Sequence, residues 1–248
     1  MGKQLAVVIM AAGKGTRMQR DDIPKVCNLV LGKPLIQYVV DQAKSLSATR
    51  IICIVGHQQQ VVRDSLKNEA VLFAEQLEQL GTGHAVLQTA ELLKDFEGDV
   101  IVLSGDVPLL RGSTLAALLD KHHRGNFAAT VLTALADNPK GYGRVLRTGE
   151  DLFDRVVEHK DASKEQLNIN EINSGIYVFD SRKLFAELNK VGNSNAQGEY
   201  YLPDVLPLMQ NTGAKVGVEI CETFSEIQGI NTVDELKTVE AKILTAQE

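Results

Sequence analysis

Short apolar runs alternate with amphipathic segments along the first half of the chain. The runs at residues 5–10, 51–55, 71–74 and 100–103 are nearly uninterrupted, which is typical of strands covered on both faces. Between them, apolar residues recur at helical spacing and predict helices at 34–46, 57–68, 83–96 and 113–123. This alternation predicts a mostly parallel sheet with helices on both faces.

The second half mixes strands and helices in a less regular order. The pattern predicts strands at 127–136, 144–147, 152–159, 173–180 and 216–222, and helices at 181–190, 202–211 and about 233–246. The last helix begins with a capping box, because Glu235 follows Thr232 by three residues. No linker or repeat divides the sequence, so we expect one α/β domain with a mixed-sheet insertion.

Composition restricts the class of protein. The 248 residues are 44% apolar and 23% charged, as in a globular domain, and no apolar run approaches the ~20 residues of a membrane-spanning helix. Three distant cysteines without a C-x-x-C spacing favour neither a zinc site nor a disulfide framework. We therefore expect a cytoplasmic protein. Its net charge of −6 disfavours nucleic-acid binding, although a local positive pocket stays compatible with it.

A glycine-rich segment, Gly13-Lys14-Gly15-Thr16-Arg17-Met18, follows the first predicted strand. Ligands of open α/β sheets bind beyond the carboxyl ends of the strands, where glycines let backbone N–H groups approach phosphates. Arg17 and the later Lys25 add positive charge suited to a polyphosphate. The spacing is neither a Walker A loop nor a dinucleotide fingerprint. A bare G-x-G is typical of a surface turn, but the longer pattern favours a phosphate site.

Polar residues follow two further strands. Gln76 and Gly81-Thr82 could present donors and acceptors to the edge of a base, or could form a polar loop in which Thr82 caps the next helix. His84 is expected on the helix surface or packed, and not catalytic. Asp106 directly follows the strand at 100–103, where a carboxylate beside phosphates is a natural Mg²⁺ ligand, and this interpretation is favoured over a turn aspartate.

The second half contributes single polar residues beside glycines or at strand ends. They are Gly143, Glu158, Asn173, Glu199 and Asn231 with their neighbours. Each alone is typical of a hairpin turn or a solvated charge. Together they fit a site that binds sugar hydroxyls.

These motifs resemble those of the sugar-phosphate nucleotidyltransferases. The resemblance is closest to the uridylyltransferase (pyrophosphorylase) domains of bacterial bifunctional N-acetylglucosamine-1-phosphate uridylyltransferase/glucosamine-1-phosphate acetyltransferases, and it extends over nearly the whole chain. The motifs that carry it are Ala11-Ala12-Gly13-Lys14-Gly15-Thr16-Arg17-Met18, Pro24-Lys25-Val26, Gly32-Lys33-Pro34-Leu35, Glu78-Gln79-Leu80-Gly81-Thr82-Gly83-His84-Ala85, Gly105-Asp106-Val107-Pro108-Leu109, Gly141-Tyr142-Gly143-Arg144, Val157-Glu158-His159-Lys160-Asp161-Ala162, Glu171-Ile172-Asn173 and Gly198-Glu199-Tyr200-Tyr201.

The resemblance implies a Rossmann-like three-layer α/β nucleotidyltransferase fold. Its sheet is mixed but mostly parallel, with helices on both faces and a small β-rich insertion that binds the sugar. Residues 1–231 would form the uridylyltransferase domain and residues 232–248 a C-terminal helix. The hexapeptide-repeat acetyltransferase domain of the family is expected to be absent, and with it acetyltransferase activity. The resemblance assigns no oligomeric state to this chain.

The resemblance also implies roles for individual residues. Arg17 and Lys25 are expected to be catalytic, with Arg17 on the triphosphate and Lys25 bridging phosphates at the reacting centre. Asp106 and Asn231 are expected to bind Mg²⁺, and Asn231 also contacts substrate. The remaining expected substrate-binding residues are Met10, Ala11, Ala12, Gly13, Gln76, Gly81, Thr82, Ser104 and Gly105 for the nucleotide, and Gly143, Glu158 and Asn173 for the N-acetylglucosamine unit.

The implied reaction converts UTP and N-acetylglucosamine 1-phosphate into UDP-N-acetylglucosamine and pyrophosphate. The sugar phosphate attacks the α-phosphorus in line, with Mg²⁺ as cofactor and no protein nucleophile, and the product serves cell-wall peptidoglycan and lipopolysaccharide synthesis. Neither nucleic acid nor membrane insertion is expected. Two alternatives stay open: an enzyme of the same fold that uses another nucleoside triphosphate or sugar 1-phosphate, and a non-catalytic subunit that binds nucleotide sugars.

Overall fold

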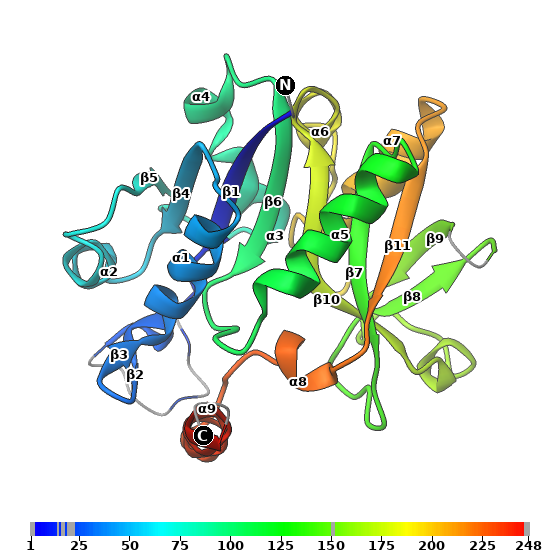
Figure 1. Ribbon diagram of the computed structural model, residues 1–248. Coiled ribbons are helices and arrows are strands. Elements are labelled where there is room, and N and C mark those ends of the chain that lie inside the picture. The colour runs from blue at the N-terminus through cyan, green and yellow to red at the C-terminus, as the bar shows by residue number, and fades with distance from the viewer. Residues whose placement is uncertain (1–2, 14, 16–17, 19–22, 150–151, 246–248) are drawn as a thin grey trace.

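A nine-stranded sheet forms the centre of the molecule (Figure 1). The computed structural model describes residues 3–13, 15, 18, 23–149 and 152–245, and all structural statements below refer to them. The main path of the sheet is β11 (Val216–Cys221), β7 (Ala129–Leu135), β10 (Glu171–Asp180), β6 (Gly98–Ser104), β1 (Gln4–Met10), β4 (Arg50–Val55) and β5 (Leu72–Glu75). A hairpin of β8 (Arg144–Arg147) and β9 (Phe153–Val157) joins it through β10, and β2 (Leu29–Val30) pairs separately with β3 (Lys33–Pro34).

One strand of the main path, β10, runs against its neighbours. It is antiparallel to both β6 and β7, whereas the other described pairs along the path are parallel. The amino end of β10 therefore lies at the same edge of the sheet as the carboxyl ends of the other six strands. Residues that begin β10 thus join residues that follow the other strands.

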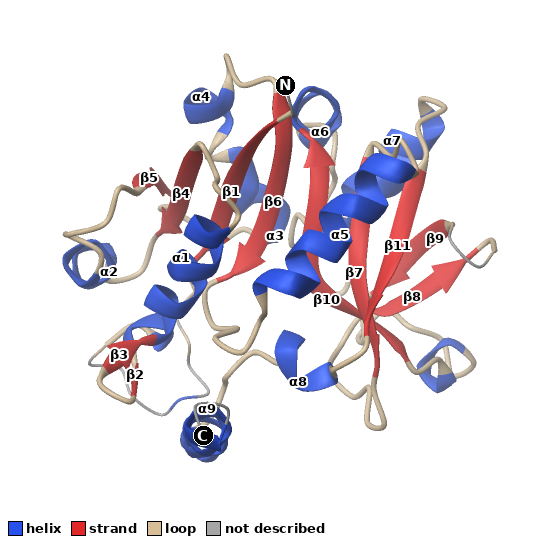
Figure 2. Cartoon of the chain, in the orientation of Figure 1, coloured by secondary structure: helices blue, strands red, loops and turns tan. Residues whose placement is uncertain are grey.

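Helices cover both faces of the sheet, as Figure 2 shows. Apart from Leu35, the buried apolar side chains of α1 (Leu35–Ser45), α2 (Gln59–Ser65), α5 (Gly112–Arg124) and α8 (Phe224–Ile227) join one apolar cluster. Those of α3 (Thr82–Leu87), α4 (Ala90–Leu93), α6 (Ser181–Leu188) and α7 (Val205–Asn211) join the other. Three short 3₁₀ turns span Lys25–Cys27, Gln166–Asn168 and Leu202–Asp204.

The residues of the central strand alternate between these two clusters. Ala6 and Val8 of β1 pack on one face, and Val7 and Ile9 pack on the other. All four are fully buried. The uninterrupted apolar run in the sequence is explained by this two-sided burial, and the predicted fold class is confirmed.

The last helix, α9 (Val233–Thr245), lies apart from the two main layers and packs against β2 (Figure 1). Its predicted capping box is present: Thr232 N donates to Glu235 Oε2 at 3.1 Å, and Glu235 N donates to Thr232 Oγ1 at 3.2 Å. Within the described part of the chain, no helix is long and apolar enough to cross a membrane.

One sequence prediction was wrong in detail. The helix predicted at 83–96 is split into α3 and α4, because Thr89 N and Thr89 Oγ1 both bond to Val86 O, three residues back, instead of continuing the α-helical pattern. The small β-rich insertion expected from the sequence is present as the β8–β9 hairpin, which lies off the main path of the sheet. The strands β7, β10 and β11 extend the main sheet, and only the β8–β9 hairpin departs from it.

A buried carboxylate, Asp99, binds several cationic or imidazole groups near the amino end of β6. Asp99 is the second residue of β6, and its carboxylate lies 2.6 Å from Nε2 of His123, 3.5 Å from Nε2 of His122 and 3.1 Å from Nζ of Lys3. Burial alone would raise the pKa of Asp99. The two imidazoles and the lysine outweigh burial, so the pKa is about 2.

We predict that Asp99→Asn lowers the free energy of unfolding by about 2 kcal/mol at pH 7, since it removes charge-assisted hydrogen bonds from a buried site. The pKa of Asp99 is lower in the folded state than in the unfolded chain. The stabilisation by Asp99 is therefore complete above the unfolded pKa near 4 and is lost as the pH falls toward 2. Urea unfolding between pH 7 and pH 2 should show the difference between wild type and variant narrowing below about pH 4. A difference that stays constant with pH would contradict this account.

Candidate active site

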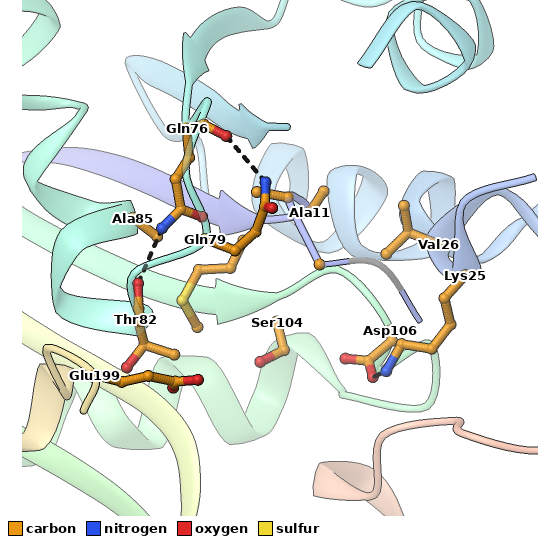
Figure 3. A pocket seen from close by; sticks show the side chains of 14 residues that line it. Ala11, Lys25, Val26, Gln76, Gln79, Thr82, Ala85, Ser104, Asp106 and Glu199 are labelled. Carbon is orange, nitrogen blue, oxygen red and sulfur yellow. Dashed lines mark hydrogen bonds and ion pairs between the residues drawn. The ribbon is translucent and has the colours of Figure 1, made fainter. Parts of the chain in front are cut away.

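Three adjoining cavities open at the edge where the carboxyl ends of the parallel strands meet. Their volumes are about 350, 210 and 330 Å³, and Ser104, the last residue of β6, lines all three. The first cavity is lined by Met10, Ala11, Ala12, Gly13, Lys25, Val26, Gln76, Gln79, Gly81, Thr82, Ala85, Ser104, Asp106 and Glu199 (Figure 3). The second extends from Ser104 to the β8–β9 hairpin, and the third extends from Ser104 to the start of α9.

One wall of the first cavity is the backbone that follows β1. Ala11 N donates to Ile54 O at 2.9 Å, which holds the chain against β4 beyond the last ladder pair. Gly13 is exposed at the end of this stretch. The glycine-rich segment predicted to bind phosphates begins here, but Arg17 lies outside the described residues and has no described position.

The side-chain amide of Gln76 has a fixed orientation. Its Nε2 donates to Gly81 O at 3.0 Å and lies 3.1 Å from Nδ1 of His84. A carbonyl oxygen only accepts hydrogen bonds, so the atom beside Gly81 is the amide nitrogen. Since Gln76 lines the first cavity, its Oε1 is the polar atom left for a ligand.

The loop before α3 is tied to a distant segment of the chain. Gly83 N donates to Tyr200 O at 2.7 Å, Tyr200 N donates to Leu80 O at 2.8 Å, and Leu202 N donates to Thr82 Oγ1 at 2.9 Å. Gly81 has φ +114°, and a Cβ there would lie 2.5 Å from Tyr200 O, so only glycine fits. The alternative in which Thr82 caps its own helix is wrong, because Thr82 is the first residue of α3 and its hydroxyl accepts from Leu202.

A lysine and two oxygen ligands converge at the junction of the first and third cavities. Lys25 Nζ contacts Asp106 Oδ2 and lies 3.2 Å from Asn231 Oδ1. Ile230 N donates to Asp106 O at 3.0 Å, which joins the segment before α9 to the end of β6. Asn231 Nδ2 donates to Gly229 O at 3.2 Å, which turns Oδ1 toward the lysine. The two oxygens therefore already surround a cationic group.

This arrangement fits a divalent cation. Carboxylate and amide oxygens are ligands that Mg²⁺ accepts in proteins, and Asp106 Oδ2 and Asn231 Oδ1 meet at the position now held by the Lys25 ammonium. No cluster of three or more His, Cys, Asp or Glu side chains suited to a metal occurs among the described residues. A metal at this point would therefore complete its coordination with water or with ligand phosphates.

The second cavity contains the residues expected to bind the sugar. Asn173 N donates to Gly143 O at 2.9 Å, so the start of β10 and the start of the hairpin are joined. A Cβ at Gly143 would lie 2.9 Å from Glu158 Oε1. Burial raises the pKa of Glu158, and the carboxylates of Asp204, Asp161 and Glu199 raise it further.

A buried arginine holds the loop over this cavity. Arg144 Nη1 donates to Pro139 O at 2.8 Å and to Tyr142 O, and Nη2 donates to Leu167 O at 3.4 Å. Burial lowers the pKa of the guanidinium. These contacts fix the backbone around Gly141 and Gly143. The arginine of the Gly-Tyr-Gly-Arg motif therefore stabilises the loop that lines the cavity.

The structure brings nearly all the predicted site residues together. Those in the first cavity are Met10, Ala11, Ala12, Gly13, Lys25, Gln76, Gly81, Thr82, Ser104 and Asp106; the second adds Gly143, Glu158 and Asn173, and the third adds Asn231. Gly105 lies behind the cavities. Its N donates to Met10 O at 2.9 Å, and a Cβ there would lie 3.2 Å from the Val26 side chain.

Sequence reasoning left several lining residues without a role. They are Gln79 in the first cavity, Tyr177, Leu202 and Pro203 in the second, and Lys140 in the third. Glu199, expected beside a sugar, lines the first cavity, and Glu235, expected only as a helix cap, lines the third. Gln79 and Glu199 belong to motifs that carried the resemblance. No pattern in the sequence pointed to Lys140 or Tyr177 as site residues, because their positions in the cavities depend on contacts between distant parts of the chain.

Comparison with known proteins fits this geometry. The family model for nucleotidyl transferases matches residues 6–222, which is most of the chain. The chain belongs to the nucleotidyl transferase family. It is 46% identical over 237 residues to the bifunctional protein GlmU of Bacillus cereus (strain G9842) and, over the same length, to that of Bacillus anthracis (strain CDC 684 / NRRL 3495). These alignments cover 96% of the chain but 51% of each relative, so this nucleotidyl transferase spans about half their length.

Solved structures share the fold at lower sequence identity. A UDP-glucose pyrophosphorylase complexed with UDP-glucose matches with a TM-score of 0.75 and 20% identity, covering 99% of this chain and all of the other. An apo-UDP-glucose pyrophosphorylase matches with a TM-score of 0.78 and 19% identity over the full length of both chains. At these identities the comparison supports the fold of this nucleotidyl transferase alone.

We predict that Lys25→Met raises the affinity of the substrate-free protein for Mn²⁺ at least threefold, because the ammonium and a metal ion compete for the same two oxygens. Calorimetric titration with Mn²⁺, or the loss of the free-ion signal in electron paramagnetic resonance, measures the change. Lys33→Met is the matched control, since Lys33 pairs with Asp41 outside the cavities. Equal or weaker Mn²⁺ binding by Lys25→Met would contradict a shared cation site.

Proposed function

We propose that this nucleotidyl transferase is a cytoplasmic enzyme that makes UDP-N-acetylglucosamine and pyrophosphate from UTP and N-acetylglucosamine 1-phosphate. One observation carries the proposal. The first and second cavities, which suit two substrates, meet at Ser104, close to Lys25, Asp106 and Asn231. The 46% identity to proteins named GlmU supports the same activity class.

The first cavity favours uracil over cytosine. Gln76 has its nitrogen committed to Gly81 O and its Oε1 available, so the ligand must offer a hydrogen-bond donor there. The N3 atom of uracil carries such a proton, whereas N3 of cytosine carries none at neutral pH, and cytosine would have to shift so that its 4-amino group met Gln76 Oε1 instead. A site built to hydrogen-bond one group discriminates strongly against an analogue that leaves it unpaired.

The second cavity suits a sugar bearing both donors and acceptors. Glu158 and Asn173 line it together with the backbone of Gly143. Amide and carboxylate groups around a space of about 210 Å³ can read the hydroxyl and acetamido groups of one hexose. Among the described residues that line the second cavity there is no lysine or arginine, so the phosphate is expected to point toward Lys25.

The chemistry requires alignment and charge stabilisation, and no protein nucleophile. The attacking phosphate oxygen is already ionised, so no strong base is needed either. Holding both substrates in line supplies up to about 7–11 kcal/mol in favourable systems. When bound by Asp106 and Asn231, Mg²⁺ would neutralise charge on the triphosphate. Lys25 would then be available to stabilise the charge that develops on the phosphates.

The decisive experiment measures pyrophosphate release with UTP, CTP and GTP against the 1-phosphates of N-acetylglucosamine, glucose and galactose, each with and without Mg²⁺. We expect release with UTP and N-acetylglucosamine 1-phosphate in Mg²⁺ to exceed every other pair at least tenfold. A preference for another pair would assign a different transferase of this fold. Binding of nucleotide sugars without any pyrophosphate release would indicate a non-catalytic subunit.

We predict that Lys25→Ala and Asp106→Ala each lower the turnover number at least 100-fold, because each removes a charge from the reacting centre. Circular dichroism should show an unchanged fold, since both side chains line open cavities. Lys33→Ala provides the control and should keep wild-type turnover. Near-normal pyrophosphate release from Lys25→Ala or from Asp106→Ala would contradict the proposed catalytic centre.

A further inference from the structure

We propose that Tyr177 is a positioning residue that fixes the amide of Asn173, so that the sugar meets a hydrogen-bond donor and not an acceptor. This inference rests on the proposed function and deepens it. Tyr177 belongs to the buried part of β10 and lines the second cavity. Its hydroxyl donates to Asn173 Oδ1 at 2.9 Å.

A bulge in β10 makes this contact possible. Asn173 pairs with Thr133 and Ile176 pairs with Leu132, so Ser174 and Gly175 are two extra residues in the ladder. Four residues of regular strand would separate Asn173 from Tyr177 by about 13 Å. With the bulge, they stand two ladder positions apart, or roughly 7 Å, on the same face of the sheet.

The bulge has its own internal support. Gly175 has φ +78°, which favours glycine. Ser174 Oγ donates to Leu132 O at 2.6 Å and accepts from Ile176 N at 3.1 Å, which replaces ladder bonds lost at the irregularity. The position of Asn173 is therefore set by backbone geometry as well as by its side-chain partners.

The orientation of the Asn173 amide follows from its partners. Gly175 N donates to Asn173 Oδ1 at 3.2 Å, and a backbone N–H cannot accept, so the atom beside it is the oxygen. The Tyr177 hydroxyl is therefore a second donor to the same oxygen. The Nδ2 group is left for a ligand of the second cavity, which Asn173 lines.

The tyrosine hydroxyl is held rigidly. Tyr177 is 1% exposed, and its ring stacks on Phe179 with a centroid distance of 5.5 Å. Burial raises the pKa of the phenol, and the nearby Glu158 carboxylate raises it further, so the hydroxyl keeps its proton and remains a donor. A rigid donor resists reversal of the amide at lower cost in entropy than a mobile one.

This arrangement gives the second cavity two different poles. Asn173 presents a donor and Glu158 presents an acceptor, and both line the same cavity. A sugar that binds well must therefore offer an acceptor to Asn173. If the amide could rotate, the cavity would offer the sugar acceptors from both Asn173 and Glu158 and no donor from this amide.

The test is equilibrium binding of UDP-N-acetylglucosamine and of UDP by calorimetry, because their ratio isolates the sugar. We expect Tyr177→Phe to weaken binding of UDP-N-acetylglucosamine about tenfold, the effect of one neutral hydrogen bond. The affinity for UDP should change less than twofold. Tyr38→Phe is the matched control, since the Tyr38 hydroxyl donates to Val30 O at the same 2.9 Å outside the cavities, and it should change neither affinity.

A second variant covers the case in which Tyr177→Phe fails to fold. Asn173→Asp keeps an acceptor for Tyr177 and Gly175 but places an oxygen where Nδ2 stood, and we expect a loss of at least 30-fold for the nucleotide sugar alone. The role of Tyr177 would be overturned if a variant lost the same affinity for UDP as for UDP-N-acetylglucosamine. It would also be overturned if neither variant lost affinity for UDP-N-acetylglucosamine. A wild type that binds UDP-N-acetylglucosamine no more tightly than UDP would overturn it too.

The proposed reaction and this inference can fail separately. If wild type releases no pyrophosphate from any substrate pair but Tyr177→Phe still weakens the nucleotide sugar selectively, the catalytic proposal falls and the positioning role stands. If turnover is as proposed and the variant binds both ligands normally, the positioning role falls alone.

Discussion

The reversal of one strand is the constraint on which the site depends. Since β10 is antiparallel to β6 and β7, its amino end lies where its neighbours have their carboxyl ends. Each buried backbone group of such a ladder needs a partner, so the direction cannot change locally. The reversal places Asn173, near the start of β10, at the same end of the sheet as the residues that follow β1 and β6. It also attaches the hairpin, because Ile172 pairs with Arg144. A fully parallel sheet would put the start of β10 at the far edge.

Charge is arranged locally against an acidic background. The chain carries a net charge of −6, yet the proposed substrates are anions. Without ligands, the ammonium of Lys25 is held by Asp106 and Asn231, so two groups with opposite tasks neutralise each other. A metal ion that took the two oxygens would release the lysine toward phosphate. A bound metal would therefore increase the positive charge of the site, and the Lys25 ammonium is paired with the two oxygens in the structure.

Much of the fold was predictable from the sequence, because fully buried strands read as apolar runs. The runs at β1, β4 and β6 and the position of Asp106 after β6 follow from that pattern alone. The approach of Asn231 to Asp106 did not, since no local pattern joins residues so far apart, and it was expected only through the resemblance. The contact of Tyr177 with Asn173 escaped for another reason. Strand periodicity puts them too far apart, and the two-residue bulge that joins them has no reliable sequence signal.

The two substrate chambers share one physical device. In each cavity, one atom of a side-chain amide is hydrogen-bonded to a backbone group that can only accept or only donate. Gln76 Nε2 donates to Gly81 O in the first cavity, and Gly175 N donates to Asn173 Oδ1 in the second. An amide is nearly symmetric in shape, so packing alone would not choose between its two orientations. The backbone groups do choose, and His84 and Tyr177 reinforce the choice from the side chains. The ligand then meets a fixed acceptor in one chamber and a fixed donor in the other. In the proposed reaction, specificity for base and sugar would therefore depend on hydrogen bonds made inside the protein before either substrate arrives, since reversing an amide would leave two internal partners unsatisfied.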